Sequence, residues 1–303
     1  MSVETIPLNE AVREQALIAY NIEGFGNLEI PPQENLLAPI IKSQSLSMLF
    51  AKRGIGKTHI ALGIGYAIAS GGKFLKWDVP KARKVLYLDG EMPACAMQQR
   101  LREIVTQSDK KAEAENFILL TPDMQELGMP DISTKEGQAV IEPFVKDAEF
   151  IIVDNISTLA RTGKENEAES WLPVQGWALE MLSRGKSVLF VHHAGKGGQQ
   201  RGSSRREDVL DLVVELRHPD NYRSDEGARF EVHFTKARHL VGKDAESFEA
   251  KLLDGQWDYL GIEGAEIKRA LDLQADGLTI REIAEETGIS KSRVQRMIKR
   301  DDR

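Results

Sequence analysis

The sequence is short of cysteine, of long apolar runs and of net positive charge, and each shortage excludes a class of protein. Its one cysteine, Cys95, cannot form an internal disulfide, which fits a reducing cytosol and excludes a disulfide-stabilised scaffold. The most apolar stretch, residues 60–70, is too short to span a bilayer. The first fifteen residues have no basic start followed by an apolar run, so we expect no signal peptide and a cytoplasmic location.

The net charge is −7, from 40 basic and 47 acidic residues, so the chain as a whole does not attract nucleic acid electrostatically. Any such binding must come from local basic patches. With 303 residues the chain has room for one large domain and a small one. No internal repeat or low-complexity tract is present.

Short unbroken apolar runs alternate with helix-compatible stretches through the middle of the chain. The runs predicted as strands are residues 45–50, 84–88, 117–120, 150–153 and 188–191, and the predicted helices are 59–70, 95–106 and 168–184. Unbroken apolar runs suit strands that are buried on both faces of a parallel sheet. From Val209 the segments 209–217, 228–238 and 251–257 are closely spaced, which predicts antiparallel strands that extend one edge.

We therefore predict an α/β fold, a mostly parallel sheet flanked by helices with antiparallel edge strands, followed by a small all-α module. The predicted domains are an N-terminal arm over 1–36, which could pack on a neighbouring subunit, a main domain over 37–261 and a helical domain over 262–303.

The octapeptide AKRGIGKT follows the first predicted strand and precedes a predicted helix, as a phosphate-binding loop does. Ala51 replaces the usual first glycine, a change that costs little if its φ is negative. Lys57 can reach the β and γ phosphates, and Thr58 can ligate Mg²⁺. The alternative is a chance match at a helix N-terminus. The expected nucleotide-binding residues are Ala51, Arg53, Gly54, Ile55, Gly56, Lys57, Thr58 and His59.

Carboxylates follow two other predicted strands, at the edge where open α/β sheets bind ligands. Asp154 ends the run FIIVD and can hold Mg²⁺, although a carboxylate there can also simply cap a turn. Glu91, in LDGEM, can orient and deprotonate the attacking water, and Asp89 is its rival for that role. His192 and His193 end the next strand and are candidates for a γ-phosphate sensor rather than for a metal site. One of the pair could instead be a buried structural histidine.

In this order, AKRGIGKT, LDGE, FIIVDN and FVHHAGKGGQQRGSS resemble the motifs of RecA-like ATPases, above all RepA-type hexameric helicases of plasmids and mobile elements. The similarity covers roughly Leu37 to Leu253. It implies a RecA-like core, ATP hydrolysis between the subunits of a ring, and single-stranded DNA in the central channel. It also implies that Lys57 and Thr58 are the phosphate-loop pair, and that Asp154 lies on the Mg²⁺ side. Glu91 would then be the catalytic glutamate in preference to Asp89, and His193, or His192, the sensor.

The resemblance offers two candidates for residues that act on a neighbour's ATP. Arg201 matches the arginine of a similar segment in that family, and Lys236 with Arg238 resembles the Lys-x-Arg pair of related helicases. Arginine suits this role because its permanent charge neutralises developing phosphate charge. Lys236 and Arg238 could instead alternate on a solvated strand face.

The loop from Ala194 to Arg206 is rich in glycine, contains no acidic residue and has a local charge of +4. It could contact a phosphate backbone through Lys196, Arg201, Arg205 and Arg206, or be solvated.

Residues 278–300 have the pattern of a helix-turn-helix, with Gly288 in the turn and residues 265–273 as a preceding helix. Ile280, Ile283 and Ala284 are predicted to face inward. Residues 288–303 contain six basic and two acidic residues, a local excess of four positive charges on an acidic chain. The residues expected to contact duplex DNA are Ser290, which would cap the second helix, and Lys291, Arg293, Gln295, Arg296 and Lys299. The alternative is a helical pair for protein docking.

Two hypotheses follow from the sequence. The first is an oligomeric, ATP- and Mg²⁺-dependent DNA helicase, a hexameric ring that acts in replication of a mobile element. In it the helix-turn-helix would bind duplex DNA while the ring acts on single strands. The second is a regulator in which ATP binding switches a helix-turn-helix on or off DNA, without strand separation.

Overall fold

The structure is a computed structural model that describes residues 18–161, 168–194, 207–253 and 255–301, and it separates into two compact units. The first unit, Met1–Pro32, contains α1 (Ile22–Gly26), whose N-cap Asn21 accepts a hydrogen bond of 2.6 Å from the backbone N–H of Gly24. No described residue of this unit is buried. The second unit begins at Gln33. Packing of the arm on a neighbouring subunit stays a prediction.

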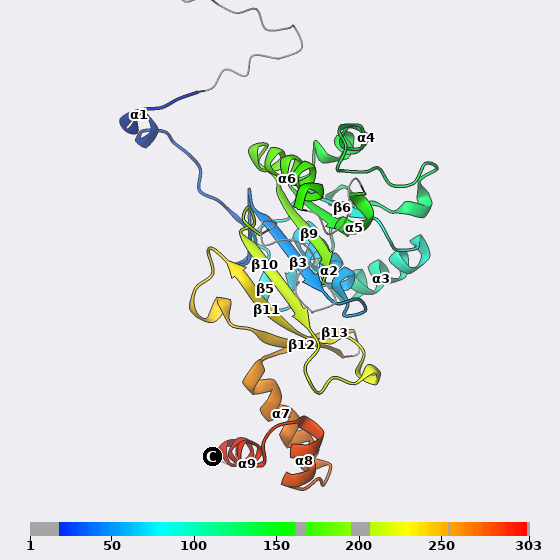
Figure 1. Ribbon diagram of the computed structural model, residues 1–303, viewed down its shortest axis with the longest axis vertical. Coiled ribbons are helices and arrows are strands. Elements are labelled where there is room, and N and C mark those ends of the chain that lie inside the picture. The colour runs from blue at the N-terminus through cyan, green and yellow to red at the C-terminus, as the bar shows by residue number, and fades with distance from the viewer. Residues whose placement is uncertain (1–17, 162–167, 195–206, 254, 302–303) are drawn as a thin grey trace, which may run out of the picture. The chain divides into compact units, whose positions relative to one another are not determined.

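A nine-stranded sheet forms the centre of the described part of the second unit (Figure 1). Its strand order is β13-β12-β11-β10-β3-β9-β8-β6-β7. The strands are β3 (Leu46–Ala51), β6 (Val85–Asp89), β7 (Phe117–Leu120), β8 (Phe150–Asp154), β9 (Ser187–His193), β10 (Leu212–Arg217), β11 (Arg229–Ala237), β12 (Phe248–Leu253) and β13 (Gln256–Gly261).

The six strands from β10 to β7 are parallel, and β11, β12 and β13 extend the β10 edge as antiparallel strands. This arrangement confirms the predicted fold class. The segment 209–217 differs from its predicted antiparallel placement, because β10 pairs in parallel with β3 and only its other side is antiparallel. It is therefore the junction between the parallel sheet and the antiparallel edge.

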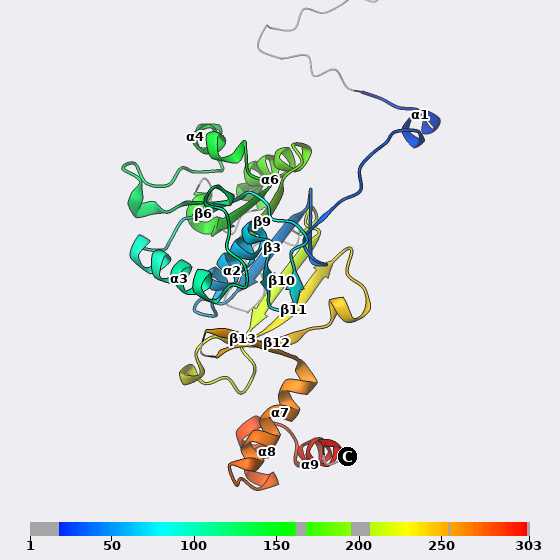
Figure 2. The same ribbon diagram turned by 180° about the vertical axis from the view of Figure 1, so that it is seen from behind.

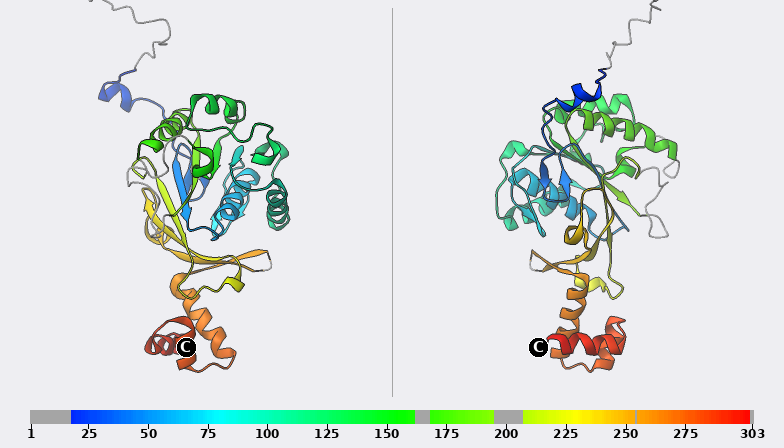
Figure 3. Two further views of the ribbon diagram at one scale, coloured as in Figure 1. Left: turned by 45° about the vertical axis from the view of Figure 1, so that its right-hand side comes forward. Right: turned by 90° about the vertical axis from the view of Figure 1, so that its left-hand side faces the viewer.

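Helices cover both faces of the parallel part of the sheet, as Figure 3 shows. The cluster under α2 (Lys57–Ser70) and α3 (Ala94–Gln107) contains Phe150 and Ile152, whereas Ile151 and Val153 belong to the cluster under the other helices. Those are α4 (Lys135–Val145), α5 (Ile156–Leu159) and α6 (Ala168–Ser183). Alternate side chains of one strand thus enter two cores, which explains why the strand sequences are apolar without a break.

Several small elements were not predicted from the sequence. They are two hairpins, the helices α1, α4 and α5, and four 3-10 helices. The hairpins are β1 (Asn35–Leu37) with β2 (Ile41–Lys42) and β4 (Lys73–Phe74) with β5 (Trp77–Asp78). The 3-10 helices are Ala114–Asn116, Pro122–Met124, Ser224–Glu226 and Gly242–Ala245. Because β1 begins at Asn35, the predicted boundary after residue 36 falls inside this strand.

Three helices follow the sheet: α7 (Ile262–Ala275), α8 (Ile280–Thr287) and α9 (Lys291–Asp301), all visible in Figure 2. Ala270, Ile283, Val294 and Ile298 form their shared core. The predicted turn is present, since Gly288 has a φ of 70° that favours glycine. The prediction for Ile280 is wrong: this first residue of α8 is 36% exposed, and unlike Ile283 and Ala284 it does not belong to the shared core. No helix in the described ranges is long and apolar enough to cross a membrane.

Candidate functional site

The phosphate-binding loop connects the end of β3 to the beginning of α2, at the centre of the sheet. Gly54 and Gly56 have φ angles of 85° and 105°, which a side chain would strain. Ala51 is the last residue of β3, and among the described non-glycine residues only Gln44 and Leu75 have a positive φ. Alanine is therefore compatible with the first position of the loop, since no left-handed backbone is needed there.

Lys57 is the first residue of α2 and its side chain is buried beneath the loop. Its Nζ donates hydrogen bonds to the carbonyl oxygens of Ala51, at 3.2 Å, and Lys52, at 3.1 Å. Burial lowers the pKa of Lys57, whereas the nearby carboxylates of Asp154 and Glu91 raise it. Of the other predicted loop residues, Arg53 is exposed and Ile55 is buried in the core.

His59 points away from the phosphate loop. Its ring makes an edge-to-face contact with Trp257 of β13, with 5.7 Å between ring centroids. Burial, and then the positive charge of Arg100, lower the pKa of His59. The structure thus places this predicted nucleotide-binding residue in a packing contact between α2 and the antiparallel edge.

Asp154, the last residue of β8, is buried directly beside the loop. Its Oδ2 accepts a hydrogen bond of 2.6 Å from the Tyr87 hydroxyl, and Thr58 also hydrogen-bonds to it. Burial raises the pKa of Asp154 to about 6, although these two hydrogen bonds and the charge of Lys57 act in the opposite direction. A positive ion between Asp154 and Thr58 would favour the charged carboxylate.

Asp89 and Glu91, the two rivals for the catalytic base, have different surroundings. Asp89 is 1% exposed, and its Oδ1 accepts hydrogen bonds of 3.1 Å from the backbone N–H groups of Glu91 and Met92. Its Oδ2 accepts a third, of 3.0 Å, from Thr121. The first two bonds hold the turn after β6, and the third connects this turn to the residue that follows β7. The side chain of Glu91 is 60% exposed and reaches over the ends of the strands, so Glu91 is the carboxylate that can meet a water molecule.

The two histidines at the end of β9 also differ. His192 is fully buried within the sheet, whereas His193 pairs with Ala51 across the strands and faces the catalytic side. Its Nε2 lies 3.5 Å from Oε2 of Glu91 and 3.3 Å from Nδ2 of Asn155. Burial, and then the charge of Lys57, lower the pKa of His193, which favours a neutral imidazole. Geometry therefore favours His193 over His192 as the sensor.

The predicted trans-acting pair lies at the far end of the strands from the phosphate loop. Lys236 pairs with Val213, which pairs with Met48 in the first half of β3, whereas the loop follows Ala51. Lys236 donates to the Glu207 carbonyl, and Arg238 donates to the Asp208 carbonyl at 2.7 Å. Neither side chain can reach the phosphate loop of its own chain. Lys196, Arg201, Arg205 and Arg206 lie outside the described residues.

The predicted DNA-contacting residues of α9 lie on one exposed face of the helix. Lys291, Arg293, Gln295, Arg296 and Lys299 are all exposed, opposite the buried Val294, Met297 and Ile298. Arg293 is ion-paired to Glu266 of α7, so its charge is partly neutralised. The Ser290 carbonyl accepts the first hydrogen bonds of α9, from Arg293 and Val294, which places Ser290 at the N-cap.

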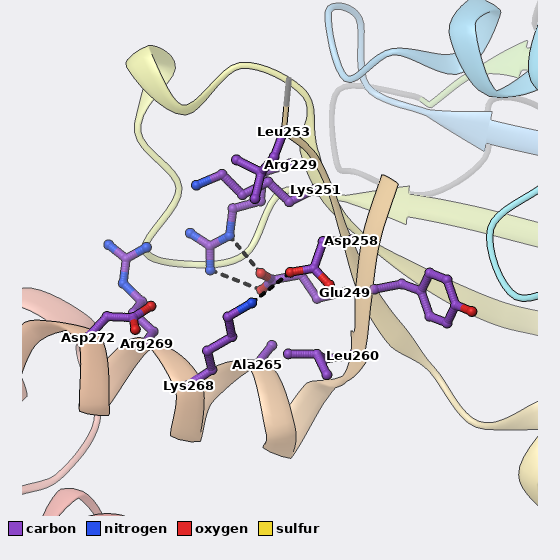
Figure 4. Close-up of a pocket in the computed structure, with 11 residues that line it drawn as sticks. Arg229, Glu249, Lys251, Leu253, Asp258, Leu260, Ala265, Lys268, Arg269 and Asp272 are labelled. Atoms are coloured by element: carbon purple, nitrogen blue, oxygen red, sulfur yellow. Dashed lines mark hydrogen bonds and ion pairs between the residues drawn. The ribbon is translucent and has the colours of Figure 1, made fainter. Parts of the chain in front are cut away.

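A polar pocket of about 160 Å³ lies between the helical module and the antiparallel edge of the sheet (Figure 4). Ion pairs beside it connect the two parts. Arg229 of β11 is 4% exposed and forms ion pairs with Glu249, at 2.8 Å, and Glu226, at 2.9 Å. Arg269 of α7 pairs with the same Glu226, at 2.9 Å. Glu226 belongs to the segment that leaves β10, whose Leu216 pairs with Ala51 of the phosphate loop. The phosphate loop is therefore connected to α7 through three links: the pairing of β3 with β10, the segment that follows β10, and the ion pair of Glu226 with Arg269.

Comparison with known proteins agrees with this geometry. Residues 11–199, well over half of the chain, match the family model described as the AAA domain. The chain belongs to this AAA domain family. Residues 265–302 match the model of a homeodomain-like domain. Membership of the AAA domain family implies nucleotide binding at the phosphate loop, and the second match supports the predicted helix-turn-helix.

A solved structure with a similar fold is that of a KaiC-like protein from the hyperthermophilic archaeon Pyrococcus horikoshii OT3, with a TM-score of 0.53. The two sequences are 14% identical, and the similarity covers 74% of this chain and 93% of the other. At this identity the likeness shows the fold alone, and it confirms that the AAA domain here has a RecA-like fold.

The residues around the loop fit a nucleotide with Mg²⁺. A Cβ atom added to Gly54 or Gly56 would meet no other atom within 4 Å, so the backbone of the loop faces open space. Thr58 and the buried Asp154 supply the hydroxyl and carboxylate oxygens that Mg²⁺ prefers. Among the described residues no cluster of three or more His, Cys, Asp or Glu could hold a metal ion.

Sequence reasoning missed three residues of this site. Tyr87 and Thr121 gave no signal, because a tyrosine within an apolar strand and a threonine after one are common core and turn residues. Asn155 could have been found, since it directly follows Asp154 at the carboxyl end of β8, where ligands bind in this class of sheet.

Proposed function

We propose that this chain is an oligomeric, DNA-dependent ATPase, and specifically a RepA-type helicase that acts in the replication of a mobile element. The observation that carries the proposal is the cluster of Glu91 and His193, 3.5 Å apart, beside the buried Lys57. A protein that only binds ATP needs a phosphate loop but no positioned carboxylate. The homeodomain-like match in the same chain supports DNA as the partner.

In this proposal Lys57 neutralises charge on the β and γ phosphates, and Glu91 orients the attacking water and accepts its proton. The water oxygen then bonds to the γ phosphorus while the bond from that phosphorus to the β-γ bridging oxygen breaks, which releases ADP and phosphate. Mg²⁺, held by Thr58 and Asp154, would neutralise the charge that develops on the phosphates. His193 would contact the γ-phosphate and report its presence to the segment that follows β9.

The positions of Lys236 and Arg238 support a ring. Since they lie at the opposite ends of the strands from their own phosphate loop, any nucleotide that they contact must belong to another copy. A head-to-tail arrangement would bring one subunit's pair to the next subunit's loop, and repetition of such a contact closes a ring, for which we propose six members. Single-stranded DNA would pass through the central channel.

The second candidate function, an ATP-switched DNA-binding regulator, is favoured by one observation. The segment between β10 and β11 contacts the helical module twice, through Arg223 with Glu286 at 3.3 Å and through Glu226 with Arg269 at 2.9 Å. A change at the phosphate loop could therefore alter the orientation of the module without any strand separation.

The test measures ATP hydrolysis and strand displacement with the full chain. Wild type should hydrolyse ATP faster with single-stranded DNA and should separate a forked duplex, whereas Glu91→Gln should bind ATP but lose about 10²- to 10⁴-fold in kcat. Glu115→Gln, at an exposed position just before the amino end of β7 and therefore on the opposite edge of the sheet, is the matched control. ATP hydrolysis without strand displacement at ring-forming concentrations would support the regulator and overturn the helicase.

A further inference from the structure

Asn155 lies between the two groups proposed to carry out and sense hydrolysis. It is 1% exposed and stands between the end of β8 and the beginning of α5, where it is the N-cap residue. Its Oδ1 accepts a hydrogen bond of 3.2 Å from the backbone N–H of Thr158, as a helix cap does. This bond fixes the orientation of the amide, because the oxygen must face α5 and the nitrogen must then face the other way.

The amide nitrogen faces the catalytic cluster. Nδ2 donates a hydrogen bond of 2.6 Å to Oε2 of Glu91, and it lies 3.3 Å from Nε2 of His193. An amide NH₂ carries two hydrogens, so Asn155 can donate to both groups at once when the imidazole is neutral and carries its proton on Nδ1. The burial of His193 beside Lys57 favours that neutral form.

Few other contacts hold the Glu91 side chain in place. Its side chain is 60% exposed, and Asn155 and His193 are the described partners that approach its carboxylate. Without an anchor, a carboxylate with this much freedom would spend most of its time in solvent, away from the position of the attacking water. Misplacement of a catalytic group by about 1 Å can cost about 100-fold in rate.

We propose that Asn155 is a positioning residue that holds the Glu91 carboxylate at the strand ends and couples its position to His193. The proposal rests on the proposed ATPase function and deepens it. Asn155 has two roles and uses a different atom for each: Oδ1 caps α5, and Nδ2 holds the Glu91 carboxylate. A purely structural role for Asn155 would use only the oxygen.

Two substitutions separate these roles. Asn155→Asp keeps an oxygen for the cap and nearly the same shape, but it replaces the donor with a second carboxylate that repels Glu91. Asn155→Ser also keeps a good N-cap residue, and it leaves Glu91 without a donor. We expect both variants to keep the wild-type Tm within a few degrees and to bind a fluorescent ATP analogue normally. Their kcat should fall about 10- to 100-fold, with KM little changed.

A double-mutant cycle tests whether Asn155 acts through Glu91. In single-turnover hydrolysis of radiolabelled ATP, the double variant Asn155→Ser/Glu91→Gln should be no slower than Glu91→Gln alone, because the anchor is useless without its carboxylate. A further loss equal to that of Asn155→Ser alone would overturn the proposal. So would a wild-type kcat in Asn155→Asp. If wild type itself shows no hydrolysis, the proposed function fails first, and the two failures are distinguishable.

Discussion

The Tyr87 hydroxyl donates a hydrogen bond of 2.6 Å to the buried carboxylate of Asp154. The two residues come from neighbouring parallel strands, β6 and β8. Asp154 is the residue that we propose for the Mg²⁺ side of the site. One neutral donor and the Thr58 hydroxyl compensate only part of the cost of burying this charge, since the pKa of Asp154 is raised to about 6. At pH 8 the free protein thus carries a destabilising charge at the position where the proposed function requires one.

Asp154→Asn should therefore stabilise the nucleotide-free protein at pH 8 while it abolishes Mg²⁺-dependent hydrolysis. Because the folded pKa of about 6 lies above the ordinary 3.8, the stability that Asp154 contributes is fully present below pH 3.8 and is lost as the pH rises through 6. The difference between these two pKa values sets an upper limit of about 3 kcal/mol on the gain in the free energy of unfolding of Asp154→Asn. Thermal unfolding in EDTA at pH 5 and pH 8 measures it.

Tyr87→Phe is the matched control for this measurement, since it removes only the donor to Asp154. It should lower the free energy of unfolding at pH 8 by about 1–3 kcal/mol, because the buried carboxylate loses a hydrogen bond. An Asp154→Asn variant that is less stable than wild type at pH 8 would show that the carboxylate charge is needed by the fold itself.

The strands β3, β6, β7, β8 and β9 could be predicted because each is a short, mostly apolar run whose alternate residues enter two cores. The unbroken FIIV of β8 is an example, and its neighbours in the sheet follow the same rule. The antiparallel edge was predicted less well, since the segment 251–257 contains the end of β12 and the beginning of β13 and is not one strand. The hairpins β1-β2 and β4-β5 could not be predicted. Their strands have two or three residues, too few for a periodicity, and they depend on contacts with the rest of the domain.

Part of the candidate site could be predicted from the sequence. The phosphate-loop motif gives Lys57 and Thr58 one expected role each, so no choice between neighbouring residues was needed. The site was less predictable where two neighbours share a residue type. Only the family resemblance favoured Glu91 over Asp89, and it named His193 with His192 as the alternative. The residue types themselves did not separate either pair, because the difference lies in hydrogen bonds to the turn and in strand alternation. His59 adjoins the loop in sequence but contacts Trp257, which the sequence places about 200 residues away.

The exposed face of α9 predicts how duplex DNA binding depends on single residues. Replacement of Lys291, Arg296 or Lys299 by alanine should weaken binding to any duplex and reduce the slope of log affinity against log salt by about one each. Arg293→Ala should change the slope less, because Glu266 already neutralises much of its charge. Fluorescence anisotropy of a labelled duplex at several KCl concentrations measures both effects.

Arg293→Ala is thus an internal control on the same helix. It should cost stability, since the contact between α9 and α7 is lost, while the other three variants should unfold like wild type. If none of the four changes alters the salt dependence of binding, α9 does not contact phosphates, and the module would instead be a protein-docking element.

Glu226 predicts an acid-sensitive connection between the antiparallel edge and α7. Burial alone would raise the pKa of Glu226, but hydrogen bonds from the Arg223 backbone and from the Arg269 and Arg229 side chains lower it to about 2. Because this value lies below the ordinary 4.5, the stabilisation is complete above pH 4.5 and is lost as the pH falls towards 2. Glu226→Gln should then cost about 1–3 kcal/mol at pH 7.

Urea unfolding of wild type and Glu226→Gln between pH 7 and pH 3 checks this prediction, and the two stability curves should converge towards the acid end. Asp258→Asn is the matched control, because it removes the ion pair to Lys268 in the same pocket, where both side chains are more exposed. It should cost less than 1 kcal/mol, since solvent screens exposed pairs. A constant difference between wild type and Glu226→Gln at every pH would show that Glu226 stabilises the junction by packing and not by its charge.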